Sequence, residues 1–117
     1  MKSIMIVEDN ERLLSTFQRI LEGDSIAVYP AHDVRGALTI MDFTKIDVAI
    51  VDYKLPRISG ERLAKHITEN SPDTKIYMIS GYDQVIEALD NIGVTVNGVF
   101  KKPIDPRLLE RIVKQVD

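Results

Sequence analysis

The amino-acid sequence predicts an α/β domain built on a five-stranded parallel sheet with helices on both faces. Short apolar runs, most of them rich in β-branched residues, alternate along the whole chain with stretches whose apolar residues recur at helical spacing. This alternation is typical of parallel strands joined by crossover helices. The 117 residues also match the length of one domain, so residues 1–117 are expected to form a single unit without a linker.

The apolar runs are too short to be buried helices and are expected to be strands. The run at residues 48–51 contains no polar residue, so both faces of that strand are expected to be covered. Pro30 closes the second run, and proline cannot donate a hydrogen bond to a neighbouring strand, so this strand is expected at an edge. The predicted strands are residues 4–7, 26–29, 48–51, 76–79 and 96–100.

A helix is expected after each strand. The first has apolar positions from Leu13 to Leu21, and Gly23 provides a stop. Asp33 is expected to cap the second helix, and either Ser59 or Gly60 opens the third. Apolar positions 85, 86 and 89 mark the fourth helix. Asp105 and Pro106, a cap followed by proline in the first turn, open the fifth.

The composition excludes several classes of protein. Hydrophobic residues make up 44% and charged residues 28%, which argues against disorder. The apolar runs fall far short of the roughly 20 residues that span a bilayer. The absence of a secretion pattern and of cysteine leads us to expect a cytoplasmic protein without disulfides or thiolate metal sites. A net charge of −3 without a basic stripe argues against direct nucleic-acid binding.

Polar side chains follow four of the predicted strands at their carboxyl ends. Glu8 and Asp9 follow the first strand, Asp52 the third, Ser80 the fourth and Lys102 the fifth. Ligands of open α/β sheets bind beyond the carboxyl ends of the strands. These side chains are therefore expected to converge in one site.

Each of these residues also has a purely structural interpretation: Asp9 as a helix cap, Ser80 as a turn residue, Lys102 as a solvated side chain. Asp52 is harder to explain in this way, because it follows a strand covered on both sides and its carboxylate needs a cation. Lys102 and a metal ion are the two cations in reach. Three carboxylates around one lysine leave excess negative charge, and oxygen ligands without cysteine favour a hard divalent ion, for which Mg²⁺ is the best candidate.

Four short motifs, in this order, resemble the receiver domain of two-component response regulators. The resemblance covers essentially the whole chain and implies a chemotaxis-regulator-like, flavodoxin-like fold with strand order 2-1-3-4-5. The motifs are Val7-Glu8-Asp9-Asn10, Asp52-Tyr53-Lys54-Leu55-Pro56 with Gly60 eight residues after the aspartate, Ser80-Gly81, and Lys102-Pro103.

The resemblance implies that Asp52 is the phosphoacceptor, which attacks a phosphohistidine on a partner. It further implies that Asp9, Asp52 and the backbone carbonyl of Lys54 bind Mg²⁺ directly, and that Glu8 acts mainly through water. Phosphoryl transfer of this kind needs an in-line nucleophile and cations on the transferring oxygens, and little covalent help from the protein.

Two further residues would contact the phosphoryl group, Ser80 through its hydroxyl and Lys102 through its ammonium. Gly81 would leave room for that group. The Lys102–Pro103 bond is expected to be cis, which proline permits at low energetic cost.

The implied biology is phosphorelay signal transduction by a phosphoprotein, and the chain is not expected to be an enzyme beyond self-catalysed phosphoryl acceptance and acyl-phosphate hydrolysis. The expected partners are a sensor histidine kinase or a phosphotransfer protein, and a downstream effector that binds the fourth helix, fifth strand and fifth helix. No membrane or direct nucleic-acid contact is expected. The chain would be a monomer or a weak phosphorylation-dependent dimer, either free-standing or part of a longer protein.

The chain departs from the common receiver pattern in two places. Val99 occupies the position where receivers usually carry an aromatic switch residue, and Phe100 falls on the next, core-facing position. Switching is therefore expected through Ser80 and the loop at residues 81–83, with Tyr82 as a substitute reporter ring. The segment at residues 93–97 is longer than usual, which predicts an irregular end to the fourth helix.

Three other classes of protein remain as alternatives. A haloacid-dehalogenase-like hydrolase would need a second aspartate where Lys54 stands. A flavin binder of the same architecture would need a glycine- and hydroxyl-rich phosphate loop where Glu8 and Asp9 stand. A receiver fold that has lost phosphorylation and serves as a docking module is disfavoured by the intact set of acids, hydroxyl and lysine, although Val99 favours it.

Overall fold

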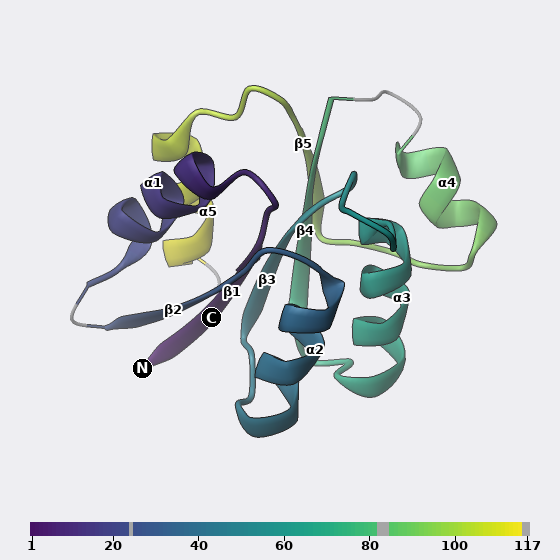
Figure 1. The fold of residues 1–117 in the computed structure, drawn as a ribbon, viewed down its shortest axis with the longest axis horizontal. Helices are drawn as coiled ribbons and strands as arrows, with labels where there is room; N and C mark the ends of the chain where they lie inside the picture. Colours follow the sequence, from purple (N-terminus) through teal and green to yellow (C-terminus); the bar gives the residue numbers. More distant parts are fainter. Residues whose placement is uncertain (24, 82–84, 116–117) are drawn as a thin grey trace.

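The computed structural model describes residues 1–23, 25–81 and 85–115, and within these residues five strands alternate with five helices (Figure 1). No helix in this part of the chain is long and apolar enough to cross a membrane. The elements are β1 (Lys2–Val7), α1 (Glu11–Leu21), β2 (Ile26–Ala31), α2 (Val34–Phe43), β3 (Val48–Asp52), α3 (Gly60–Asn70), β4 (Lys75–Ser80), α4 (Val85–Asn91), β5 (Gly98–Lys101) and α5 (Pro106–Gln115).

The strands form one parallel sheet in the order β2-β1-β3-β4-β5, which confirms the predicted fold class and strand order. The strand order reverses direction at β1, so the crevice expected in such sheets lies at the carboxyl ends of β1 and β3. The register aligns these ends, because Val7 pairs with Val51 and Asp52 pairs with Ile79.

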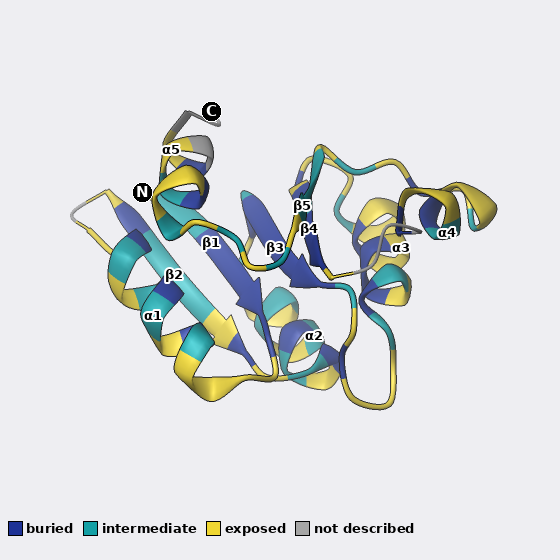
Figure 2. Cartoon of the chain, turned by 90° about the horizontal axis from the view of Figure 1, so that it is seen from above, coloured by how far each residue is buried: buried dark blue, intermediate teal, exposed yellow. Residues whose placement is uncertain are grey.

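Helices cover both faces of the sheet. Figure 1 shows α1 and α5 on one face and α2, α3 and α4 on the other. Each face has its own apolar cluster: Phe17, Ile50 and Leu109 belong to the cluster on the first face, and Ala37 and Leu63 belong to the cluster on the second. All five residues of β3 are buried, as the absence of polar alternation predicted (Figure 2).

Each predicted strand is present, with boundaries that differ by one or two residues from the sequence prediction. Two of these differences have a clear physical reason. β2 continues through Pro30 to Ala31, because β2 is an edge strand and the missing proline N–H costs no bond to a neighbour there. β5 begins at Gly98 rather than at position 96. Asn97, which precedes β5, makes two hydrogen bonds to Ile76. Its backbone N–H donates to the carbonyl of Ile76, and its side-chain oxygen accepts the Ile76 N–H at 2.9 Å.

The expected helix caps are largely confirmed. The Asp33 side chain accepts the N–H of Gly36 at 2.8 Å, and the Asp105 side chain accepts that of Arg107 at 2.9 Å. α3 begins at Gly60 with Ser59 as its N-cap residue, although the Ser59 side chain makes no capping hydrogen bond. The local sequence thus set where these helices begin.

The end of α4 is regular, so the expected irregularity was wrong. The carbonyl of Leu89 accepts the N–H of Val94, and the carbonyl of Asp90 accepts that of Gly93, which has a φ of +72°. This is the Schellman arrangement, in which a left-handed glycine terminates a helix. Leu89 and Val94 are both buried in the same apolar cluster, which completes the motif.

Candidate functional site

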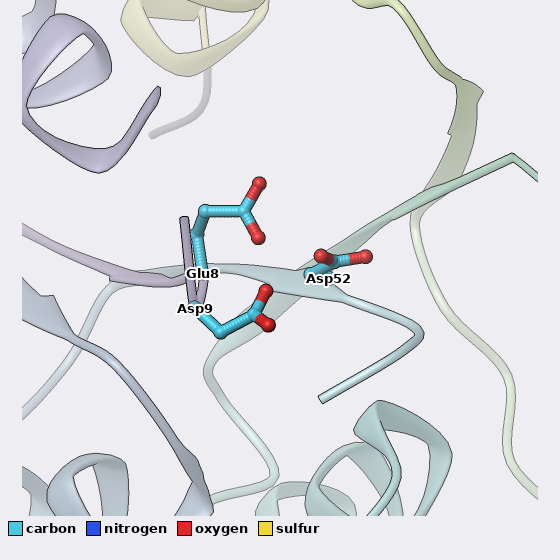
Figure 3. Close-up of side chains that lie close together, drawn as sticks. All are labelled: Glu8, Asp9 and Asp52. Atoms are coloured by element: carbon cyan, nitrogen blue, oxygen red, sulfur yellow. The ribbon is translucent and has the colours of Figure 1, made fainter. Parts of the chain in front are cut away.

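Three carboxylates meet at the carboxyl end of the sheet. Glu8 and Asp9 follow β1 directly, and Asp52 is the last residue of β3. One oxygen of each can be chosen so that all three lie within 4.8 Å of one another. Figure 3 shows the Glu8 and Asp9 side chains extending from the end of β1 toward Asp52. The sheet register thus brings together acids that lie more than forty positions apart in the sequence.

Lys102 supplies the positive charge of the site. Its Nζ lies 2.8 Å from Oδ2 of Asp52 and 3.4 Å from Oε1 of Glu8. Burial lowers the pKa of Lys102, but the hydrogen bond and charge of Asp52, followed by the charge of Glu8, outweigh this effect and leave the pKa raised. The ammonium is therefore a permanent cation at the pH of a cell. The interpretation of Lys102 as a merely solvated side chain was wrong.

Glu8 is the most unusual of the three acids. Its residue is 3% exposed, and its Oε2 is buried without a hydrogen-bond partner among the described residues. Desolvation by burial, followed by the hydrogen bond and charge of Asp52, raises the pKa of Glu8 to about 8. A buried carboxylate oxygen without a partner is costly, so this atom needs a proton or a cation.

Asp9 is exposed and does not cap α1, which removes its purely structural interpretation. The cap is Asn10, whose side-chain oxygen accepts the N–H of Leu13 at 3.0 Å. The sequence held a signal for this, because asparagine is a preferred N-cap residue and Glu11 provides an acid in the first turn. With the cap supplied by its neighbour, the Asp9 carboxylate remains available to the acidic cluster.

The turn after β3 holds the side chain of Asp52 in place. Its Oδ1 accepts the backbone N–H of Lys54 at 3.3 Å, and the carbonyl of Tyr53 accepts the N–H of Gly60 at 2.7 Å. A Cβ at Gly60 would overlap the carbonyl oxygen of Asp52 and lie 2.9 Å from Cα of Tyr53. Glycine is therefore required at position 60, because the start of α3 packs directly against the backbone of the acidic residue.

Ser80 ends β4, beside the end of β3, and is buried. Its carbonyl accepts the N–H of Lys102 at 2.8 Å, which ties the loop carrying the lysine to the end of β4. The Lys102–Pro103 bond is cis, as expected. A Cβ at Gly81 would meet no described atom within 4 Å, so no contact within this part of the chain requires glycine there.

Val99 and Phe100 lie on opposite faces of β5. Val99 is half-buried, packs against the cluster under α4, and lines a depression of about 250 Å³ together with Leu89 and Val94. Phe100 is also only half-buried and stacks on Tyr77 with ring centroids 6.0 Å apart, so it is less enclosed than expected. Tyr82 and Asp83, which we expected to take part in switching, lie outside the described residues.

The site can hold a divalent cation. Its donors are carboxylate oxygens, it contains no sulfur or imidazole within the described residues, and the buried Oε2 of Glu8 has no hydrogen-bond partner among them. Hard cations that prefer oxygen ligands fit such a donor set. The same residues would repel an anion that arrived without a counter-charge.

Comparison with known proteins identifies the family. The family model for the response regulator receiver domain matches residues 4–114 of this chain. The chain belongs to this family, and its fold and acidic pocket are those of a receiver domain of two-component systems. Receiver domains of response regulators interact with histidine kinases and effector domains.

The sequence identity to individual relatives is modest. The chain is 25% identical over 115 residues to the alkaline phosphatase synthesis transcriptional regulatory protein PhoP of Bacillus subtilis, which covers 98% of this chain and 48% of PhoP. It thus spans about half the length of that curated relative. Among solved structures, a CheY-like receiver domain protein from Methanospirillum hungatei is 28% identical with a TM-score of 0.88, covering 100% of this chain and 94% of the other. A response regulator from Burkholderia pseudomallei, solved with a phosphorylated aspartic acid, a calcium ion and citrate, is 26% identical with a TM-score of 0.83, covering 100% of this chain and 67% of the other.

Proposed function

We propose that residues 1–117 form one receiver domain that accepts a phosphoryl group on Asp52 in a Mg²⁺-dependent reaction. The observation that carries this proposal is the position of the Asp52 carboxylate, which is 4% exposed at the end of β3, 2.8 Å from Lys102 and close to two further acids. The donor would be a phosphohistidine of a sensor histidine kinase or of a phosphotransfer protein.

The side chains have distinct parts in the transfer. An oxygen of Asp52 attacks phosphorus in line with the P–N bond of the phosphohistidine, a P–O bond forms, and the electron pair of the broken bond stays on the imidazole nitrogen. Lys102 neutralises one phosphoryl oxygen, and the Ser80 hydroxyl donates a hydrogen bond to another. The Lys54 N–H, 3.3 Å from Oδ1 of Asp52, holds the carboxylate in its orientation.

Mg²⁺ would be held by Asp9, Asp52 and the backbone carbonyl of Lys54, with Glu8 acting through water. When bound, the ion supplies positive charge to the transferring phosphoryl oxygens. The phosphorylated aspartate and calcium ion of the Burkholderia pseudomallei relative support this assignment by similarity. A bound divalent ion would favour the charged form of Glu8, whose pKa is raised to about 8 without metal.

The output surface would consist of α4, β5 and α5, where a downstream effector protein or domain binds. Ile86 is 61% exposed on α4 beside the depression that Val99 lines. Because Val99 carries no ring, Ser80 and the loop after β4 would carry the change to this surface. We further propose a cytoplasmic location, no direct contact with nucleic acid or membrane, and a monomer or weak phosphorylation-dependent dimer.

A second candidate function is a receiver fold without phosphorylation that serves as a docking module. The aliphatic Val99, half-buried beside an open depression, favours this alternative. The two functions differ in whether Asp52 takes up a phosphoryl group.

Incubation with acetyl phosphate and Mg²⁺, followed by intact-mass spectrometry, tests the proposal. The wild type should show one labile phosphoryl adduct that is absent in EDTA and absent from Asp52→Asn. Asp73→Asn, which alters an exposed aspartate in the turn before β4, should behave like the wild type. An equal adduct on Asp52→Asn would refute the phosphoacceptor assignment, and no adduct on any variant would favour the docking module.

A further inference from the structure

A continuous groove lies between α2 and α3, and its lining includes no residue of the acidic pocket or of the proposed output surface. It consists of two neighbouring depressions, of about 290 and 410 Å³, that share Val34, Leu38 and Ile58. The first extends to the loop between β3 and α3, and the second follows α3. Both views show α2 and α3 side by side on this face (Figure 1 and Figure 2). We name this surface, defined by the lining of the two depressions, the α2–α3 groove.

The floor of the α2–α3 groove is apolar. Val34 is buried, Leu38 is half-buried against the core, and Ile58 is a large apolar side chain that remains 42% exposed. Ile58 follows Arg57, whose φ of +67° places it in the left-handed region that non-glycine residues rarely adopt. The loop therefore presents to the groove an apolar side chain that is partly exposed to water.

Cations surround this floor. Arg35 and Arg57 border the first depression, and Arg62 and Lys65 border the second. None of these four forms an ion pair with another described residue. Asp33 and Glu69 are the carboxylates in the lining, and an oxygen of Asp33 already accepts the Gly36 N–H. This face is thus positively charged on a chain whose net charge is −3.

We propose that the α2–α3 groove is a docking site for an acidic amphipathic helix of a partner protein. The apolar residues of such a helix, spaced three or four positions apart, would cover Val34, Leu38 and Ile58. Its flanking Asp and Glu side chains would then meet Arg35 and Arg57, which favours association and sets the orientation of the helix. A nucleic acid would leave the apolar floor uncovered and would face Asp33, so it fits this surface less well.

This inference is independent of phosphoryl transfer, because it uses no residue of the acidic pocket. It can therefore be tested on the unphosphorylated full chain. A display library of helical peptides of about 15 residues, with a fixed apolar stripe and randomised other positions, would be selected on the immobilised protein. Enrichment of Asp and Glu at the randomised positions is expected.

The selected peptides are then titrated against variants. Arg35→Glu/Arg57→Glu should weaken binding by at least about tenfold, because two attractive charge contacts become repulsive. Ile58→Ser, at an exposed loop position, should weaken binding without disturbing the core. Arg12→Glu/Arg19→Glu, which reverses two exposed arginines on α1, is the matched control and should bind as the wild type does.

Three results would overturn the proposal: no enriched peptide, enrichment of Lys and Arg, or undiminished binding to Arg35→Glu/Arg57→Glu. Sedimentation analysis adds a fourth. Concentration-dependent dimerisation that disappears in Arg35→Glu/Arg57→Glu would assign the α2–α3 groove to a second copy of this chain and would likewise overturn it.

Discussion

Replacing Glu8 by glutamine in the absence of metal should stabilise the fold at neutral pH. Glu8 is 3% exposed, and its Oε2 has no hydrogen-bond partner among the described residues. Glutamine keeps the shape and one acceptor for Lys102, whose Nζ lies 3.4 Å from Oε1 of Glu8. The substitution therefore removes a buried acid that must hold a proton in the folded state at neutral pH, and it leaves the pairing of Asp52 with Lys102 intact.

The magnitude follows from the raised pKa of Glu8. Burial, then the hydrogen bond and charge of Asp52, raise this pKa from 4.5 to about 8. As the pH rises, the unfolded chain loses its proton first, so the stability linked to protonation is fully present below about pH 4.5 and is lost as the pH climbs to about 8. Wild type should accordingly lose about 1 kcal/mol by pH 5 and about 3 kcal/mol by pH 7, and Glu8→Gln should avoid this loss.

Urea unfolding of both proteins in EDTA at pH 5 and pH 7 measures the difference. The advantage of Glu8→Gln should grow by about 2 kcal/mol between these pH values, with an unchanged dependence of the free energy on urea. Glu69→Gln, which alters an exposed glutamate on α3, is the control and should differ from wild type by less than about 0.5 kcal/mol at both pH values. An advantage that is absent at pH 7, or equal at the two pH values, would refute the reasoning.

Three further predictions concern neighbouring features of the molecule. In EDTA, Asp9→Asn should be about 0.5 kcal/mol more stable than wild type, because it removes one charge of the acidic cluster at an exposed position. Mg²⁺ at about ten times its dissociation constant should stabilise wild type by about 1.4 kcal/mol and the variant much less. Urea curves measure both effects, and lower stability of Asp9→Asn in EDTA would contradict the acidic-cluster explanation. Gly60→Ala should cost on the order of 3 kcal/mol in thermal or urea unfolding, since its Cβ would meet the backbone of β3. Gly23→Ala, whose Cβ would have no described atom within 4 Å, should be nearly neutral. Equal effects would disprove the close-approach argument. Asn10→Ala should lose about 1 kcal/mol of stability and Asn10→Asp little, because the aspartate still caps α1, and a larger loss for Asp9→Ala than for Asn10→Ala would show that the cap was assigned to the wrong residue.

Local signals in the sequence predicted most of the fold. Asp33 and Asp105 start their helices where expected, because a cap depends on residues only two or three positions away. The boundaries that were missed depend on distant neighbours. The side chain of Asn97 accepts a hydrogen bond from Ile76, twenty-one positions away in the sequence, and β5 begins only after it. No residue near Asn97 in the sequence indicates that contact.

The acidic site was likewise predicted only in part from the sequence. The residue types at the strand ends already indicated an oxygen-rich site with one lysine, because parallel strands bring their carboxyl ends to one edge. The sequence also led us to expect excess negative charge among the three acids. The structure adds that the raised pKa of Glu8 arises first from burial and only then from Asp52.

By itself, the sequence determined the α/β class, the strand that is covered on both faces, and the membership of Glu8, Asp9, Asp52 and Lys102 in one site. These follow from periodicity and from the direction of the strands, which are local properties. Only the tertiary structure decided that Glu8 is buried while Asp9 is exposed, and that a basic, apolar groove lies between α2 and α3. Solvent exposure and charge around a surface depend on which side chains other elements bring near, and that arrangement exists only in the folded chain.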